Sequence, residues 1–349
     1  MEHVVAVNQR GREAILNGME RDLVSVVTPV YNGERYLREC IESVLGQTYH
    51  AWRYVIVNNA STDDSLAVAQ HYARLDSRIT VVDATEHLPV QSSLSRAMSL
   101  VDADAIYCKP LMADDWLYPE CISTMVTSAE TDPAIGLVCC YAIRNGKEVM
   151  FDSIQSSGGV VSFLSGRDTC RASLLEKDAY FFGSPTTMLI RADLIRKRTP
   201  FYNPRNLHVD EESCYDILQE SNFCFIHQVL AFCREHQRSQ TSRNRHLGSM
   251  LVGRVSCLVK YGAVYLSTDE FEQRRQQRFT EYYGLLARCA LRRQPREFWL
   301  YHRERLQLIG APLSRMRLAL AIVRHLAGRL VSAYSALRGE TAGAARFDS

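Results

Sequence analysis

The stretch VSVVTPVYNGERYLRECIESVLGQTYHAWRYVIVNNASTDD, residues 24–64, decides the fold. Its first part is apolar and β-branched and is then broken by Pro29 and Gly33, which predicts a buried strand that ends in a loop. A second apolar run at residues 53–59 predicts another strand, followed by the polar residues 60–64. Between them, apolar residues recur at helical spacing, which predicts an amphipathic helix with one face on a sheet: Leu37, Cys40, Ile41, Val44 and Leu45.

Strand, helix and strand at this spacing form a βαβ unit. In open α/β sheets, ligands bind beyond the carboxyl ends of the strands. The polar clusters at 28–32 and 58–64 both fall at those ends. The sequence therefore predicts an α/β domain whose ligand site is formed by the loops after its first two strands.

Two adjacent carboxylates, Asp114 and Asp115, follow an apolar strand predicted at 105–108 and precede a helix that begins near Pro119. Neighbouring carboxylates repel each other unless a cation or solvent relieves the charge. Mg²⁺ and Mn²⁺ bind one or two carboxylates together with phosphate oxygens, so a divalent ion on a diphosphate would relieve this pair. The alternative is structural, with Asp115 as the cap of the following helix.

Three linked motifs resemble those of family 2 glycosyltransferases. That family typically opens with a strand ending in P-x-Y-N, a helix ending in S-x-L-x-Q-T-Y and a strand ending in D-D-x-S-x-D. Here the motifs stand as PVYN at 29–32, SVLGQTY at 43–49 and NNASTD at 58–63. The resemblance implies the GT-A fold, the Rossmann-like mixed α/β sheet of nucleotide-diphospho-sugar transferases, flanked by helices and followed here by a C-terminal helical extension.

The resemblance assigns the nucleotide-sugar donor to the loops after the first strands. A UDP-sugar is favoured, because Tyr31 can stack on a pyrimidine base, and Asn58 and Asn59, where the family usually has Asp, still offer an acceptor to its N3–H. Arg96 would reach a phosphate; the alternative is an exposed helical arginine. The implied donor-binding residues are Thr28, Pro29, Tyr31, Asn32, Asn58, Asn59, Arg96 and Asp114.

The resemblance also implies a Mn²⁺ or Mg²⁺ cofactor, with Asp115, Asp114 and His236 as candidate ligands. Because Ala113 occupies the first position of the family's acidic motif, Asp115 is expected to bind the metal directly and Asp114 to lie nearer the sugar or ribose. His236, together with Arg234, belongs to CREHQRSQT at 233–241, which resembles the R-x-H-x-x-S stretch that ends the family's catalytic domain. The alternative role for His236 is a structural hydrogen bond.

Inversion at a sugar carbon needs a base that deprotonates the attacking hydroxyl. The family places an acidic residue at the start of a helix well after the metal motif, and Asp210 takes that position here, with Glu211 and Glu212 in reserve. The alternative is that these carboxylates only favour the helix dipole. The segment FGSPTT at 182–187 resembles the one that flanks the family's acceptor site.

Charge is distributed unevenly along the 349 residues. Of 41 basic and 39 acidic residues, 19 and 8 lie in 241–349, which leaves 22 and 31 in the part before. We therefore expect an N-terminal extension at 1–22, a catalytic domain at 23–241 and a basic, mostly helical region at 242–349, interrupted near Gly262, Pro295 and 310–312. The stretch 315–338 is typical of an interfacial membrane helix; the alternative is a helix packed on the catalytic domain.

These features favour an inverting glycosyltransferase that transfers a sugar to a saccharide or lipid-linked acceptor in bacterial polysaccharide synthesis. Eleven scattered cysteines and an N-terminus without a long apolar stretch suggest reduced thiols in the cytoplasm, with the inner face of the cell membrane as a further location. No motif for nucleic acid accompanies the basic helices. A sugar nucleotidyltransferase would need a Gly/Arg-rich phosphate loop that TPVYNGERY lacks. The alternative, suggested by Asn58, Asn59 and Ser95, is a catalytically weak nucleotide-sugar-binding scaffold or sensor.

Overall fold

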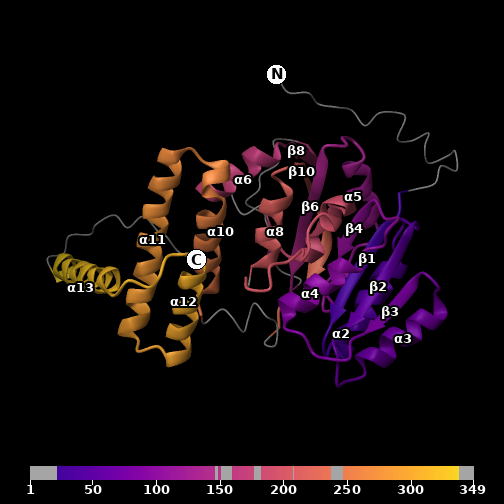
Figure 1. The fold of residues 1–349 in the computed structure, drawn as a ribbon, viewed down its shortest axis with the longest axis horizontal. Helices are drawn as coiled ribbons and strands as arrows, with labels where there is room; N and C mark the ends of the chain where they lie inside the picture. The colour runs from indigo at the N-terminus through magenta and orange to yellow at the C-terminus, as the bar shows by residue number, and fades with distance from the viewer. Residues whose placement is uncertain are drawn as a thin grey trace. The chain divides into compact units, whose positions relative to one another are not determined.

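The computed structural model describes residues 22–145, 148–150, 159–176, 182–206, 208–236 and 247–337, with side chains up to 331. The chain divides into two compact units, residues 1–237 and 238–349, shown in Figure 1. The predicted N-terminal extension, apart from Asp22, and the predicted boundary at 241–242 lie outside the described residues. Unit 1 carries the βαβ motif and the acidic pair, and unit 2 carries the basic helices.

Unit 1 is built on one mixed sheet (Figure 1). Its neighbours run in the order β3, β2, β1, β4, β9, β6, β10, β5, with β7 beside β6 and β8 beside β10. The first four are parallel, whereas β9, β5, β7 and β8 each pair antiparallel with a neighbour. The strands are β1 (Val24–Val30), β2 (Trp52–Asn58), β3 (Ile79–Asp83), β4 (Tyr107–Pro110), β5 (Trp116–Leu117), β6 (Ile135–Arg144), β7 (Glu148–Met150), β8 (Val161–Leu164), β9 (Met188–Arg191) and β10 (Asn222–Cys233).

Helices connect the parallel strands, as the βαβ pattern requires. The first three crossovers are α2 (Glu34–Leu45), α3 (Ser65–Leu75) and α4 (Val90–Ser99), and the rest of unit 1 adds α5 (Cys121–Ala129), α6 (Gly166–Leu175), η1 (Pro185–Thr187), α7 (Ala192–Arg196) and α8 (Val209–Ile217). Because the chain returns from β3 across the sheet to β4, the strand order reverses at β1 and β4. A crevice at the carboxyl ends of these strands is the usual ligand position in such sheets.

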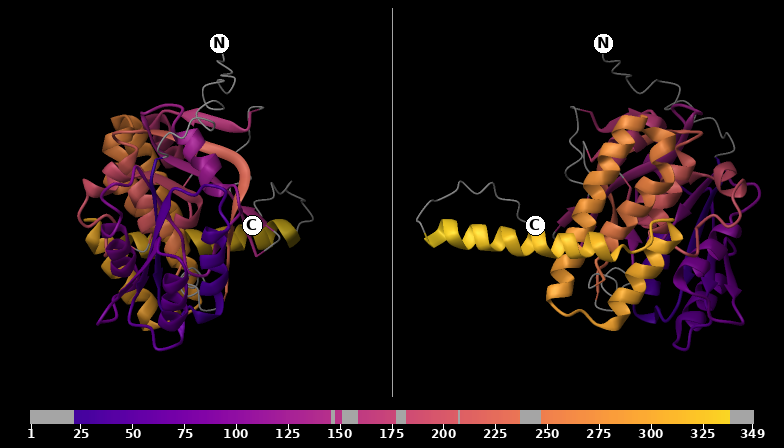
Figure 2. Two further views of the ribbon diagram at one scale, coloured as in Figure 1. Left: turned by 90° about the vertical axis from the view of Figure 1, so that its right-hand side faces the viewer. Right: turned by 60° about the vertical axis from the view of Figure 1, so that its left-hand side comes forward.

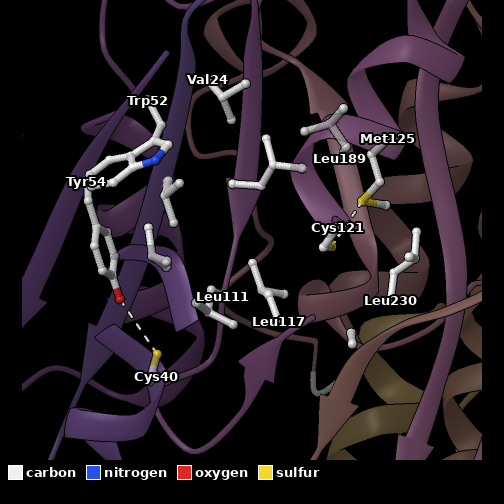
Figure 3. Close-up of a cluster of buried hydrophobic side chains, with 14 of the residues drawn as sticks. Val24, Cys40, Trp52, Tyr54, Leu111, Leu117, Cys121, Met125, Leu189 and Leu230 are labelled. Atoms are coloured by element: carbon white, nitrogen blue, oxygen red, sulfur yellow. Dashed lines mark hydrogen bonds between the residues drawn. The ribbon is translucent and has the colours of Figure 1, made fainter. Parts of the chain in front are cut away.

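The core of unit 1 lies between α2, α5 and the sheet. The predicted apolar face of α2 is confirmed, since Leu37, Cys40, Ile41 and Val44 are buried. Figure 3 shows the cluster, in which the Cys40 thiol lies 3.6 Å from the Tyr54 hydroxyl. All eleven cysteines are free thiols and ten are buried, which agrees with the expectation of reduced, packed side chains.

Three parts of unit 1 differ from the sequence prediction. The run FFGSPTTMLIR at 181–191 predicts a strand, but residues 185–187 form a 3-10 turn, η1, and only 188–191 form the short strand β9. The long strand β10 was not anticipated, although FCFI at 223–226 is apolar and aromatic. Helix α5 is capped by Glu120, so the alternative role of Asp115 as its cap is wrong.

Unit 2 is helical, as predicted. Its helices are α10 (Ser249–Tyr265), α11 (Thr268–Leu291), α12 (Arg296–Leu308) and α13 (Arg315–Leu337), and Ser267 with Glu270 forms a capping box at the start of α11. The interruption predicted near Gly262 falls at 266–267, between α10 and α11. The helix continues through Gly262 itself, where a Cβ would lie 2.2 Å from the Phe271 ring, so glycine allows α10 and α11 to approach. None of the helices in the described residues is both long and apolar enough to cross a bilayer.

Candidate active site

The loops after β1 and β2 are tied together by their polar residues. Asn32 adopts a left-handed backbone conformation, with φ of 50°, and its side-chain oxygen Oδ1 accepts a hydrogen bond from the Thr62 backbone amide at 2.8 Å. The Ser61 hydroxyl accepts from the Asn32 amide at 3.0 Å, and the Ser65 hydroxyl accepts from the Gly33 amide at 2.8 Å. The polar cluster at 58–65 therefore holds the first loop in place, which leaves Tyr31 at its exposed tip.

Several predicted donor-binding residues are occupied by contacts within the protein. Thr28 is fully buried and accepts a hydrogen bond from the Tyr54 hydroxyl at 2.8 Å. The Asn59 side chain donates to the Leu88 carbonyl at 2.8 Å and accepts from the Leu88 amide at 2.9 Å. The Asn59 side chain therefore fixes the loop after β3 to the residue that follows β2.

Asn58 and the exposed ring of Tyr31 have different surroundings. The Asn58 amide donates to the exposed Asp83 carboxylate at 2.7 Å, so a carboxylate is present at this end of the sheet although the family's Asp is not. Tyr31 is 48% exposed, and its ring centroid lies 4.1 Å from that of His87. Sequence reasoning missed both Asp83 and His87, and only the position of Asp83 directly at the end of a predicted strand could have indicated it.

The acidic pair splits into a buried and an accessible carboxylate. Asp115 is 4% exposed, and its two oxygens accept hydrogen bonds from the Thr186 hydroxyl at 2.5 Å and the Arg234 amide at 2.7 Å. Burial, and after it the charge of Asp114, raises the pKa of Asp115 to about 7. Asp114 keeps about a third of its side chain accessible and lies 3.1 Å from the His236 imidazole, Oδ2 to Nε2.

The pairing of β10 with β5 brings these distant residues together. Ala231 lies opposite Leu117 and Phe232 opposite Trp116, so the residues after β10 must pass the acidic pair. Arg234 then donates from Nε to the Asp114 carbonyl at 3.0 Å. Its guanidinium also lies 4.5 Å from the centre of the Tyr36 ring and 2.5 Å from the Glu39 carboxylate.

Two further residues that support this site were not expected from the sequence. Lys109, fully buried on β4, donates to the backbone carbonyls of Thr186 and Met188. Thr186 in turn donates to Asp115 and accepts from the Met112 amide at 3.2 Å. A lysine inside an apolar strand is the one unusual signal that the sequence offered, because buried lysine is rare unless it is paired.

Of the three acids on α8, Asp210 is the most accessible, because Glu211 and Glu212 are both buried. Glu212 accepts from Asn206 at 2.6 Å and from Asn203 at 3.3 Å, which ties it to the preceding loop. Glu211 is buried. Asp210, in the first turn, stays partly accessible, and burial of its carboxyl raises its pKa above the ordinary range.

Arg96 lies apart from the acidic pair. It lines a cavity of about 470 Å³ formed by α4, α7 and the segment that follows α7. The lining of that cavity contains no residue of β1 or β2 and neither Asp114 nor Asp115. None of the other predicted donor-binding residues lines the cavity that contains Arg96.

The described residues contain no cluster of three or more His, Cys, Asp or Glu side chains that could hold a metal ion. Asp114 and His236 nevertheless offer an oxygen and a nitrogen donor 3.1 Å apart. Two protein ligands suit a divalent ion that also binds phosphate oxygens, and the imidazole favours Mn²⁺ over Mg²⁺. Asp114 and His236 therefore fit a divalent ion whose remaining ligands include the oxygens of a diphosphate.

Curated glycosyltransferases are similar to this chain in sequence. An uncharacterised glycosyltransferase of Haemophilus influenzae is 28% identical over 187 residues, which cover 52% of this chain and 55% of that protein. The putative glycosyltransferase EpsH of Bacillus subtilis is 32% identical over 150 residues, 40% of each chain. The matched region thus spans about half or less of these relatives.

Two solved structures share the fold. Staphylococcus aureus TarS 1–349, solved in complex with UDP-GlcNAc, has a TM-score of 0.61 at 13% identity and covers 94% of both chains. The Pyrobaculum calidifontis mannosyltransferase PcManGT, solved with GDP-Man and Mn²⁺, has a TM-score of 0.54 at 15% identity and covers 93% of this chain and 84% of that one. The expected GT-A fold, a mixed sheet flanked by helices with a helical C-terminal region, is confirmed.

The family model for glycosyl transferase family 2 matches residues 25–199. This range includes β1 from its second residue, β2, β3 and β4, the loops after β1 and β2, and the acidic pair, whereas Asp210, Arg234 and His236 lie after it. Since the match takes in half of the chain, this protein belongs to glycosyl transferase family 2.

Proposed function

We propose that this protein is a metal-dependent, inverting glycosyltransferase that moves a sugar from a nucleotide-diphosphate sugar to a saccharide or lipid-linked acceptor. The observation that carries the proposal is the accessible Asp114–His236 pair, 3.1 Å apart, beyond the carboxyl end of β4. The loops after β1 and β2 end at the same edge of the sheet, so a donor nucleotide would extend from Tyr31 toward this pair.

Asp114 and His236 are the residues that would hold the metal. A bound Mn²⁺ would supply positive charge that stabilises the departing nucleoside diphosphate. Asp115 does not bind the metal itself in this proposal, because its two oxygens accept hydrogen bonds from Thr186 and Arg234. The role expected for Asp115 from the sequence, direct ligation, therefore passes to Asp114 in this proposal.

Asp210 is the proposed general base. It accepts the proton of the acceptor hydroxyl while the new bond forms between that oxygen and the anomeric carbon of the sugar. The bond from the anomeric carbon to the diphosphate oxygen breaks on the opposite face, which inverts the configuration. A carboxyl with a raised pKa is the better proton acceptor, and Glu212 is already occupied by Asn203 and Asn206.

The donor base is proposed to stack on Tyr31, with Asn58 and Asp83 beside it. UDP-sugars remain the favoured donors; TarS was solved with UDP-GlcNAc, but PcManGT with GDP-Man. As part of the same proposal, the basic helices of unit 2 bring the enzyme to a membrane that holds a lipid-linked acceptor.

The test is a thermal-shift screen of the full chain against UDP-, GDP- and dTDP-sugars, with and without Mn²⁺. A ligand at about 100 times its Kd should add about 2.7 kcal/mol to the free energy of unfolding. We expect one nucleotide class to stabilise the protein only with metal, and Asp114→Asn to abolish that dependence. Asp104→Asn is the matched control, since its side chain is 81% exposed and it precedes β4, whereas Asp114 follows the other end of that strand.

Failure of every nucleotide to stabilise the protein would contradict the donor site. Binding without release of nucleoside diphosphate, in the presence of Mn²⁺ and an oligosaccharide acceptor mixture, would favour the scaffold or sensor instead. Release that survives Asp210→Asn unchanged would contradict the assignment of the base.

A further inference from the structure

A groove between α11 and α13 combines arginines with an apolar floor. Its volume is about 580 Å³. Arg317 and Arg324 of α13 line one wall, and Phe279 and Tyr283 of α11 line the other. Tyr283 also receives a hydrogen bond from the Ser314 amide at 2.9 Å, which fixes the start of α13 against α11. The groove is therefore part of the packed structure of unit 2.

The positive charge of this groove is not neutralised by the protein. In the described part of the chain, neither Arg317 nor Arg324 forms an ion pair, whereas Arg275 on the facing helix is paired with Glu272 at 2.9 Å. The two α13 arginines are seven residues apart and so lie on the same side of the helix. The whole segment 315–337 contains four arginines and no acidic residue. The Arg317 guanidinium also lies 5.8 Å from the centre of the Phe279 ring, a contact that leaves its charge available to an anion.

α13 has two apolar faces, and only one of them is packed. Leu318 and Ala321 contact the core of unit 2. A second row is exposed, from Met316 at 71% to Leu330 at 72%, and Figure 2 shows α13 extending past α11. The exposed row recurs at intervals of three and four residues along one side of the helix, with Val331 beside its last member: Met316, Leu320, Val323, Leu326 and Leu330.

We propose that this surface of unit 2, α13 with its groove, binds an anionic membrane. The phosphate of a phospholipid head group lies between Arg317 and Arg324, and the exposed row of α13 enters the acyl region beneath it. The inference deepens the membrane contact in the proposed function by naming the face and the lipid chemistry. A second copy of this chain is a poorer occupant, because pairing two such helices would oppose four arginines to four arginines.

The experiment is flotation of the full-length protein with vesicles of phosphatidylcholine, alone or mixed with phosphatidylglycerol. We expect binding only to the mixed vesicles. Each arginine near an anionic surface contributes roughly a fivefold gain in partition coefficient, so the double variant Arg317→Gln/Arg324→Gln should bind about 30-fold more weakly. The control is Arg296→Gln/Arg303→Gln, which removes the same charge from exposed positions on α12 and should bind as the wild type does.

A second pair of variants tests the apolar row without touching the arginines. Leu330→Asp should lose binding, whereas Leu300→Asp, at a 51% exposed position on α12, should keep it. Equal binding to both vesicle types, equal loss in both arginine doubles, or a Leu330-dependent dimer by sedimentation would overturn the proposal. Nucleoside diphosphate release by the same variants separates the membrane proposal from the proposed transferase activity. Loss of vesicle binding with intact release supports the membrane site and leaves the transferase proposal unaffected. Loss of release in the wild type with intact vesicle binding contradicts the transferase proposal and leaves the membrane site supported.

Discussion

Thr186→Val tests whether the acidic pair is held in the way that the structure indicates. Thr186 is fully buried, and its hydroxyl donates to the Asp115 carboxylate at 2.5 Å while accepting from the Met112 amide at 3.2 Å. Valine has nearly the same shape, so the variant removes two hydrogen bonds and creates little cavity. A hydrogen bond to a charged group contributes about 1.5–3 kcal/mol and a neutral one about 1 kcal/mol, which predicts a total loss of about 3 kcal/mol.

Thr187→Val is the matched control. Thr187 is equally buried, but its hydroxyl donates only to the neutral Ser184 carbonyl at 2.9 Å, so its loss should cost about 1 kcal/mol. The assay is urea unfolding of the full chain in EDTA, followed by circular dichroism, at a pH well above the Asp115 pKa of about 7. We expect the two variants to differ by about 2 kcal/mol.

The pH dependence gives a second check on the same hydrogen bond. The Thr186 hydroxyl favours the charged form of Asp115, so its removal raises the pKa of that carboxyl further. The loss in Thr186→Val should therefore be largest above the Asp115 pKa and should shrink below it, where the folded protein carries a neutral carboxyl. Equal losses in the two variants at high pH, or a loss independent of pH, would refute the reasoning.

Three other changes give separate predictions. Asp210→Asn should lower kcat about 100- to 10,000-fold. It should not lower stability at neutral pH, because the raised pKa of Asp210 means that charging this carboxyl costs folding free energy. A parallel loss of turnover and melting temperature would contradict the base role. Burial lowers the pKa of His302 to about 4, so the unfolded chain takes up the proton first as the pH falls. Unit 2 should therefore lose about 3 kcal/mol of unfolding free energy between pH 6.5 and pH 4. Unfolding followed by Trp299 fluorescence should show a flatter pH profile of stability for His302→Gln. A Cβ at Gly166 would lie 2.0 Å from the Ser221 carbonyl, so Gly166→Ala should cost about 1–3 kcal/mol in urea unfolding, and an unchanged midpoint would show that the backbone can move there.

The sequence by itself determined the local elements of the donor side. The strand, helix and strand at 24–58 follow from apolar patterning, which acts between neighbours in the chain, and four of the five residues predicted for the apolar face of α2 are buried, with Leu45 half-buried. The same is true of the helical start at Asp210 and of the acidic pair at a strand end. The spacing of three motifs was enough to indicate the family.

Only the tertiary structure decided which polar side chains are used by contacts within the protein and which are available to a ligand. Asn58 and Asn59 look alike in sequence, but Asn59 is used by Leu88, while Asn58 faces an exposed carboxylate. Asp114 and Asp115 are likewise adjacent, and only burial against Thr186 and Arg234 separates their roles.

The partners in these contacts come from residues far along the chain, up to 122 positions away in the case of Asp114 and His236. Their meeting depends on the unanticipated strand β10 and on its register with β5. That register is set by packing across the whole sheet, because a slip of one residue would turn every side chain of the strand to the other face. Local patterning carries no information about such a pairing, and so the contact between Asp114 and His236 became visible only in the folded chain.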